Sequence, residues 1–188
     1  KQMKNLYILD AVSFLFRSYF AIGGMTNPRG QSTNALYGFI RSIQKIQKDF
    51  SPDTIVAVFD GPNNKKARTA IYEEYKSNRE GMPEDLFPQL EWAHNFCEAA
   101  GIPYLSEEGV EADDLIGAIT KWAENRGIEV FICSSDKDLC QLISDKVFMV
   151  NTHKNNLLID RAKVEEMHGV KPEQIVDYLA IMGDKADN

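Results

Sequence analysis

Cysteine and histidine are scarce in this chain of 188 residues, with three of each. The three cysteines, Cys97, Cys133 and Cys140, are odd in number and form no CxxC pair, which disfavours a disulfide framework. Cys133 lies in an apolar, strand-like run, so buried reduced thiols and a reducing compartment are expected. The three histidines are scattered along the chain, and the HExxH motif of metalloproteases is absent.

Long apolar runs are also missing. No stretch approaches the length that a membrane-spanning helix needs, and no signal peptide is visible. We therefore expect a cytoplasmic protein without a membrane partner.

An excess of positive charge is lacking too, because 28 acids stand against 21 bases and the formal net charge is -7. A basic nucleic-acid binder has the opposite sign overall, although the average misleads if acids and bases cluster separately. The GxSxG, Walker A and GxGxxG motifs are absent. A phosphatase with an Asp-x-Asp nucleophile is disfavoured, because Ala11 and Val12 follow Asp10. Asp136-Lys137-Asp138 could suggest a nucleotide-sugar transferase, but this spacing is common by chance.

Apolar runs alternate with helical patterns along the chain. Strands are predicted at 6–9, 54–59, 102–105 and 129–133, and a strand pair at 146–150 and 156–159. Helices are predicted at 33–50, 84–100, 161–168 and 172–182, from the acids at 111–114 to Gly127, and from Leu139 onward. This alternation predicts one α/β domain over 1–188, with a mostly parallel central sheet and helices on both faces.

Carboxylates follow the predicted strands. Asp10, Asp60 and Asp136 each stand directly after one, and the carboxyl ends of parallel strands meet at one edge of a sheet. Oxygen ligands without His or Cys suit Mg²⁺ or Mn²⁺. Taken singly, each acid is more often a turn residue or a helix cap. Together they exceed the needs of one ion, so two or more ions are predicted, with these candidate ligands: Asp10, Asp60, Glu111, Asp113, Asp114, Asp136, Asp138, Asp184 and Asp187.

Residues 61–83 differ in character from the rest of the chain. Their net charge is +2, against -9 for the remainder, and Tyr72 and Tyr75 are interleaved with the bases. Few aliphatic residues are present, so an exposed and mobile segment is expected. The alternative is a solvated surface helix.

Six motifs in order give the chain a resemblance to a known family. They are Leu9-Asp10, Val58-Phe59-Asp60, Tyr75-Lys76-Ser77-Asn78-Arg79, Gly109-Val110-Glu111-Ala112-Asp113-Asp114, Ser135-Asp136-Lys137-Asp138-Leu139, and Met182-Gly183-Asp184 through Asp187-Asn188. The chain resembles the 5′–3′ exonuclease domain of bacterial DNA polymerase I and the related flap endonucleases. The resemblance runs nearly from Leu6 to Asn188, and it implies the PIN-like fold of 5′ nucleases.

The resemblance also implies roles for individual residues. Asp10, Asp60, Glu111 and Asp113 would surround a first metal, and the other five acids would serve a second. Lys76 and Arg79 match catalytic residues at the scissile phosphate. The segment at about 61–83 matches a basic helical arch inserted after the second strand, through which a 5′ single strand passes, with these candidate DNA-binding residues: Lys65, Lys66, Arg68 and Tyr75.

The resemblance implies a structure-specific 5′–3′ exonuclease or flap endonuclease that hydrolyses DNA by two-metal catalysis in replication and repair. Its partner would be DNA with a 5′ end or flap in the bacterial nucleoid, and a polymerase domain could be linked covalently. Ser135 stands where the family usually has Gly, and the chain stops before the family's helix–turn–helix segment that grips duplex DNA. The alternatives are a metal-dependent nuclease acting on RNA and a catalytically weak nucleic-acid-binding fragment.

Overall fold

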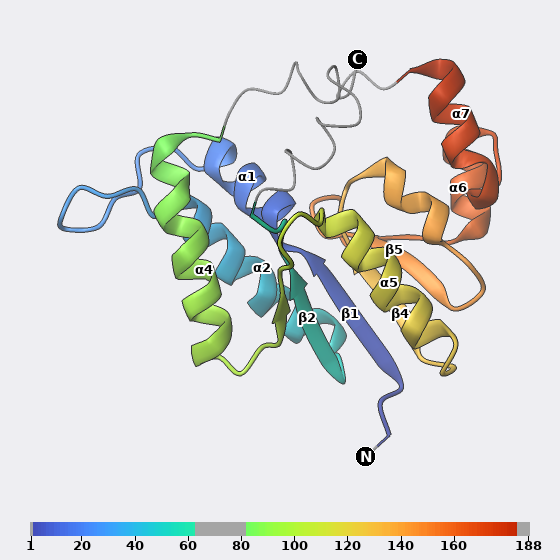
Figure 1. Ribbon diagram of the computed structural model, residues 1–188, viewed down its shortest axis with the longest axis horizontal. Helices are drawn as coiled ribbons and strands as arrows, with labels where there is room; N and C mark the ends of the chain where they lie inside the picture. Colours follow the sequence, from blue (N-terminus) through green and yellow to red (C-terminus); the bar gives the residue numbers. More distant parts are fainter. Residues whose placement is uncertain (1, 63–81, 184–188) are drawn as a thin grey trace.

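The computed structural model describes residues 2–62 and 82–183 and contains one six-stranded sheet (Figure 1). The strand order is β3-β2-β1-β4-β5-β6. The first five strands pair in parallel, and β6 is antiparallel to β5. The strands are β1 (Asn5–Asp10), β2 (Thr54–Val58), β3 (Tyr104–Leu105), β4 (Glu129–Cys133), β5 (Val147–Asn151) and β6 (Leu157–Ile159). The prediction of a mostly parallel α/β sheet is confirmed.

Helices pack on both faces of this sheet. One face is covered by α1 (Ala11–Ala21), α2 (Asn34–Phe50) and α4 (Phe87–Ala99). The other face is covered by α5 (Ala112–Glu124), α6 (Arg161–His168) and α7 (Ile175–Met182). Short 3₁₀ turns complete the described elements: η1 (Glu84–Leu86), η2 (Lys137–Leu142) and η3 (Pro172–Gln174).

The central strand β1 divides the core into two layers. Leu6 and Ile8 pack in the layer that contains α5, whereas Tyr7 and Leu9 pack in the layer that contains α1, α2 and α4. All four side chains are at least 95% buried. A strand that is buried on both faces has a continuous apolar sequence, so the apolar run Leu6–Leu9 indicates a central position in the sheet. The last residue of this strand, Asp10, is thereby fixed at the carboxyl edge of the sheet.

Three predicted helices differ from the structure. The helix predicted from Leu139 is wrong, because residues 137–142 form the 3₁₀ turn η2 and Ile143 returns to an extended backbone. The helix predicted over 84–100 is divided into η1 and α4, and the helix predicted over 172–182 is divided into η3 and α7. At η2 and η3 the apolar spacing is right, but a short turn already buries an apolar side chain, Leu139 in η2 and Pro172 in η3.

Other properties of the chain agree with its composition. Cys97, Cys133 and Cys140 are free and buried, and burial raises the pKa of the Cys133 thiol to about 12. None of the helices in the described ranges combines the length and the apolar character needed to cross a membrane. Most of the predicted arch, residues 63–81, lies outside the described residues.

Candidate metal centre

Three of the predicted acids are brought to one edge of the sheet. Asp10 ends β1, Asp60 stands two residues beyond the end of β2, and Asp136 stands three residues beyond the end of β4. Because β1 lies between β2 and β4, the three carboxylates come from neighbouring strands. Both Asp60 and Asp136 act electrostatically on Asp10.

Asp10 is the most buried of these acids, with 3% of its surface exposed. Its Oδ2 accepts hydrogen bonds from Ser13 Oγ at 2.7 Å and from Ser134 Oγ at 2.8 Å. Burial raises the pKa of Asp10, the two serine hydrogen bonds oppose that rise, and the charges of Asp136 and Asp60 add to it. The two serines therefore orient the ionised carboxylate of Asp10. Burying this charge is energetically costly unless a nearby cation compensates it.

Asp60 connects the end of β2 to the start of α5. Its Oδ1 accepts a hydrogen bond from the backbone N–H of Ala112 at 2.7 Å, and Glu111 is the N-cap residue of α5. Glu111 is buried, with 6% exposed. Asp113 and Asp114 follow in the first turn of α5, as the sequence predicts. The carboxylates at this end of α5 also gain from the helix dipole.

The third acidic stretch follows β4 and is tied to Asp10 through Ser134. The backbone N–H of Asp136 donates to Ser134 Oγ at 3.1 Å, and the N–H of Asp138 donates to Asp136 Oδ1 at 3.0 Å. Ser134 therefore donates to Asp10 and accepts from Asp136 at once. Ser13 and Ser134 were not identified as site residues from the sequence. The one available signal was their position in the sequence, because Ser13 is close to Asp10 and Ser134 is close to Asp136.

The described residues supply only part of the predicted site. Within residues 2–62 and 82–183, no group of three His, Cys, Asp or Glu side chains that could hold one metal ion is formed. The sheet edge thus gathers the acids without assembling a complete ligand set from the described residues alone. The other predicted ligands and all of the predicted catalytic and arch residues lie outside the described residues: Asp184, Asp187, Lys65, Lys66, Arg68, Tyr75, Lys76 and Arg79.

The donor chemistry fits a hard divalent cation. The strand-end residues Asp10, Asp60 and Asp136 offer carboxylate oxygens, which suit Mg²⁺ or Mn²⁺ better than a softer metal. The buried charge of Asp10 beside two further acids favours a positive ion at this edge.

Sequence comparisons identify known proteins that are similar to this chain. The family model for the 5′-3′ exonuclease, N-terminal resolvase-like domain, matches residues 5–169. A protein named 5′-3′ exonuclease from Aquifex aeolicus is 41% identical over 186 residues, which are 99% of this chain and 64% of that protein. DNA polymerase I of Deinococcus radiodurans is 41% identical over 184 residues, which are 98% of this chain and 19% of that protein.

A solved structure agrees with the sequence matches. The flap endonuclease of bacteriophage T5, in a pseudo-enzyme–product complex with DNA and metal ions, superposes with a TM-score of 0.76 at 26% identity. That match covers 98% of this chain and 68% of the other. The chain thus spans just under two thirds of the Aquifex relative and about a fifth of the polymerase.

Proposed function

Because the chain belongs to the family of the 5′-3′ exonuclease N-terminal resolvase-like domain, we propose that it is a metal-dependent nuclease that cuts DNA near 5′ ends or 5′ flaps. The observation that supports this most directly is the meeting of Asp10, Asp60 and Asp136 at the carboxyl edge of the matched domain. The domain over 1–188 would be the 5′ nuclease catalytic unit.

We propose that two or more Mg²⁺ or Mn²⁺ ions are held by carboxylates of this chain. The first group would be Asp10, Asp60, Glu111 and Asp113, and the second group would be Asp114, Asp136, Asp138, Asp184 and Asp187. Bound in pairs, such ions lower the pKa of a bound water and stabilise the leaving oxygen of a phosphodiester.

The protein's own contribution would be to fix the direction of each carboxylate. Ser13 and Ser134 both bond Oδ2 of Asp10, which leaves Oδ1 of Asp10 without a hydrogen-bond donor in the described part of the chain. The Ala112 N–H holds Oδ1 of Asp60 against the start of α5. Hydrogen-bonded carboxylates bind metals with less loss of side-chain entropy than free ones, so these contacts would preorganise the site.

Charge on the reacting phosphate would be offset by bases of the segment that follows Asp60. We propose that Lys76 and Arg79 contact the scissile phosphate. Arg68, Tyr75, Lys65 and Lys66 would guide the 5′ strand toward the acids. The sequence position of this segment supports the proposal, because the segment begins directly after the strand-end acid Asp60 and ends before α4.

The proposed partner is DNA with a 5′ end or flap, encountered in a bacterial cytoplasm and nucleoid. The relatives include chains named DNA polymerase I, so a covalently linked polymerase is a further proposed partner. Roles in replication and repair follow from such a substrate.

Cleavage of a labelled 5′-flap substrate tests the proposed function. We expect products with Mg²⁺ or Mn²⁺ and none with EDTA. A matched RNA flap serves as the control for the sugar, and a covalently closed circular duplex, which has no 5′ end, serves as the control for structure. Equal cleavage of all three substrates would contradict structure-specific action on DNA.

Removal of the metal is expected to lower the stability of the folded chain. Divalent ions bind the native acidic edge and not the unfolded chain, so they stabilise by mass action, by about 2.7 kcal/mol at a hundredfold excess over Kd. Thermal unfolding with millimolar Mn²⁺ should therefore give a Tm several degrees above that with EDTA. An unchanged Tm would contradict a formed metal site, whatever the cleavage assay shows.

Lys76→Ala is expected to lower turnover more than affinity. A cation at the scissile phosphate acts mainly as charge develops in the transition state, and loss of one such group typically costs about 10²-fold or more in rate. Single-turnover cleavage at saturating protein separates this effect from binding. Lys65→Ala is the control, and it should change the single-turnover rate by less than about threefold because it would act only as a steering charge. A wild-type rate for Lys76→Ala would limit this residue to binding.

A further inference from the structure

A hollow with both polar and apolar lining residues lies beside the acidic edge, between α1 and the ends of β4 and β5. Its outline spans about 220 Å³, much of it open solvent, and its wall includes Phe14, Arg17, Val150, Thr152 and His153. Ser135 and Asn151 are further lining residues. Ser13 and Ser134 also line it, and both donate their hydroxyl protons to Asp10. The two serines therefore separate the hollow from the Asp10 carboxylate.

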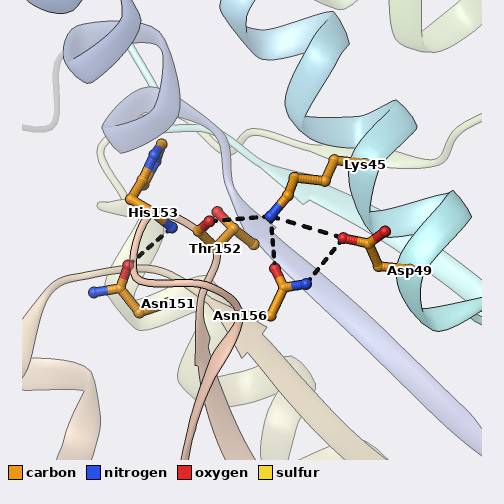
Figure 2. A network of polar contacts seen from close by, with 6 residues as sticks. All are labelled: Lys45, Asp49, Asn151, Thr152, His153 and Asn156. Carbon is orange, nitrogen blue, oxygen red and sulfur yellow. Dashed lines mark hydrogen bonds and ion pairs between the residues drawn. The ribbon is translucent and has the colours of Figure 1, made fainter.

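One wall of the hollow is the turn that follows β5, and hydrogen bonds join this turn to α2 (Figure 2). Lys45 Nζ donates to the carbonyl oxygen of Thr152 at 3.3 Å and to Asn156 Oδ1 at 3.0 Å. Asn156 Nδ2 donates in turn to Asp49 Oδ2 at 2.9 Å, and Lys45 pairs with the same carboxylate at 3.7 Å. The three hydrogen bonds join residues more than 100 positions apart in the chain, so the turn is a fixed wall.

Among the residues that the structure describes, the hollow has one cation in its wall, Arg17, and the Asp10 carboxylate lies behind the lining serines. The described residues that line it include Arg17 and no carboxylate. After burial, the charges of Arg17 and Lys45 are the next causes that lower the pKa of His153, which places both cations close to this ring. Phe14 packs against the same ring with 5.5 Å between centroids. An anion that contacts Arg17 in the hollow would be separated from the Asp10 carboxylate by Ser13 and Ser134.

One hydroxyl group that lines the hollow has no hydrogen-bond partner in the part of the chain that the structure describes. Thr152 is 8% exposed, and its Oγ1 is buried with no hydrogen-bond partner among the residues described. A buried hydroxyl without a partner is destabilising, and rotation about its Cα–Cβ bond can turn it toward an acceptor in the hollow that Thr152 lines. The side-chain amide of Asn151 and the hydroxyl of Ser135 add further donors on the same wall.

We propose that this hollow binds a phosphate group of the DNA strand that passes the acidic edge, with Arg17 as the cation and Thr152 as a hydrogen-bond donor. The proposal rests on the proposed nuclease function for the identity of the strand. A phosphate offers the acceptor oxygens and negative charge that these donors lack, and Arg binds it with a planar fork of N–H groups. Ser13 and Ser134 would then link the phosphate site to the position of Asp10.

Titration with inorganic phosphate tests the site without cleavage. In metal-free, isotope-labelled protein at constant ionic strength, the ring resonances of His153 and the amide resonances of Asn151 and Thr152 should shift saturably. Arg17→Met should weaken this binding about tenfold or more, because the lost contact is charged. Arg41→Met is the matched control, since Arg41 is an exposed arginine of α2, and it should bind phosphate as the wild type does.

A second matched pair isolates the hydroxyl. Thr152→Val should weaken phosphate binding by about two- to tenfold, the usual range for one neutral hydrogen bond. Thr120→Val is its control, because Thr120 Oγ1 in α5 is equally buried and without a partner in the part of the chain described. Neither valine should lower the Tm, since no hydrogen bond is lost. Absence of a saturable shift in the wild type, or equal binding by all four variants, would overturn the proposal.

Oligonucleotide binding identifies the source of the phosphate. If Arg17→Met weakens binding of a 5′-phosphorylated strand more than that of its 5′-hydroxyl counterpart, the hollow takes a terminal phosphate. Equal weakening assigns an internal phosphodiester. A protein that binds phosphate but cuts no DNA would contradict the nuclease function alone, whereas one that cuts DNA without the phosphate shifts would contradict the hollow alone.

Discussion

Asp10→Asn should abolish detectable cleavage and, without metal, raise the stability of the fold. The asparagine keeps the shape of the side chain and can still accept the hydrogen bonds of Ser13 and Ser134 through its amide oxygen. It removes the negative charge that a divalent ion would require. Loss of a ligand that contributes several kcal/mol to the charged transition state corresponds to a rate reduction of about 10³-fold or more.

The expected gain in stability has an electrostatic cause. Asp10 is 3% exposed and feels the charges of Asp136 and Asp60, so its ionised form is penalised in the folded chain. Replacing it with a neutral amide relieves both the desolvation and the repulsion. Each kcal/mol recovered should raise the Tm in EDTA by about 2–4 °C for a chain of this size.

A metal titration of the same variant gives the sharper comparison. The rise in Tm with Mn²⁺ that we expect for the wild type should shrink or vanish in Asp10→Asn, while the variant in EDTA melts above the wild type in EDTA. Asp145→Asn is the control for loss of one acid, because Asp145 lies in the exposed loop between η2 and β5. Wild-type cleavage by Asp10→Asn would remove this residue from the metal centre.

The sheet and its acidic edge were predictable because their signals are local. The apolar run Leu6–Leu9 is buried on both faces of the central strand, and an acid directly after such a run must stand at the carboxyl edge. Likewise the acids at 113 and 114 precede a helical apolar pattern and do occupy the first turn of α5. In these stretches local pattern and tertiary position agree.

Contacts between distant segments were not predictable from the sequence. Ser134 reaches Asp10 across 124 positions, and Lys45 reaches the carbonyl of Thr152 across 107 positions. Serine and lysine are common on surfaces, so neither residue announces such a role. The 3₁₀ turn η2 was missed for a related reason: the apolar spacing of Leu139 and Leu142 is compatible with a longer helix, and only the packing around it decides.

Gly61 shows how such a contact can control the site, and Gly61→Ala should be severely destabilising. A Cβ at this position would lie 1.6 Å from the carbonyl oxygen and 2.4 Å from the carbonyl carbon of Glu107. Both atoms belong to the backbone, so no side-chain rotation relieves the clash. The loop after β2 and the loop before α5 would have to separate.

That separation would break the contacts that hold Asp60 in place. The Gly61 N–H donates to the Val110 carbonyl at 2.9 Å, the Gly109 N–H donates to the Pro62 carbonyl at 2.8 Å, and the Ala112 N–H donates to Asp60. Overpacking and lost backbone hydrogen bonds together place the cost at about 3 kcal/mol or more, or a fall in Tm of at least about 6 °C.

Gly117→Ala provides the matched control, because the same substitution is made where there is room. Gly117 lies within α5, and a Cβ there would meet only Leu142 Cδ2, at an ordinary 3.8 Å. Alanine in a helix interior is favoured over glycine, so this variant should be more stable by about 0.5–1 kcal/mol. Thermal unfolding of the two variants in EDTA should therefore move in opposite directions. If Gly61→Ala instead melts with the wild type, the close approach of residues 61 and 107 is wrong, and Asp60 loses the contact that fixes it beside Asp10.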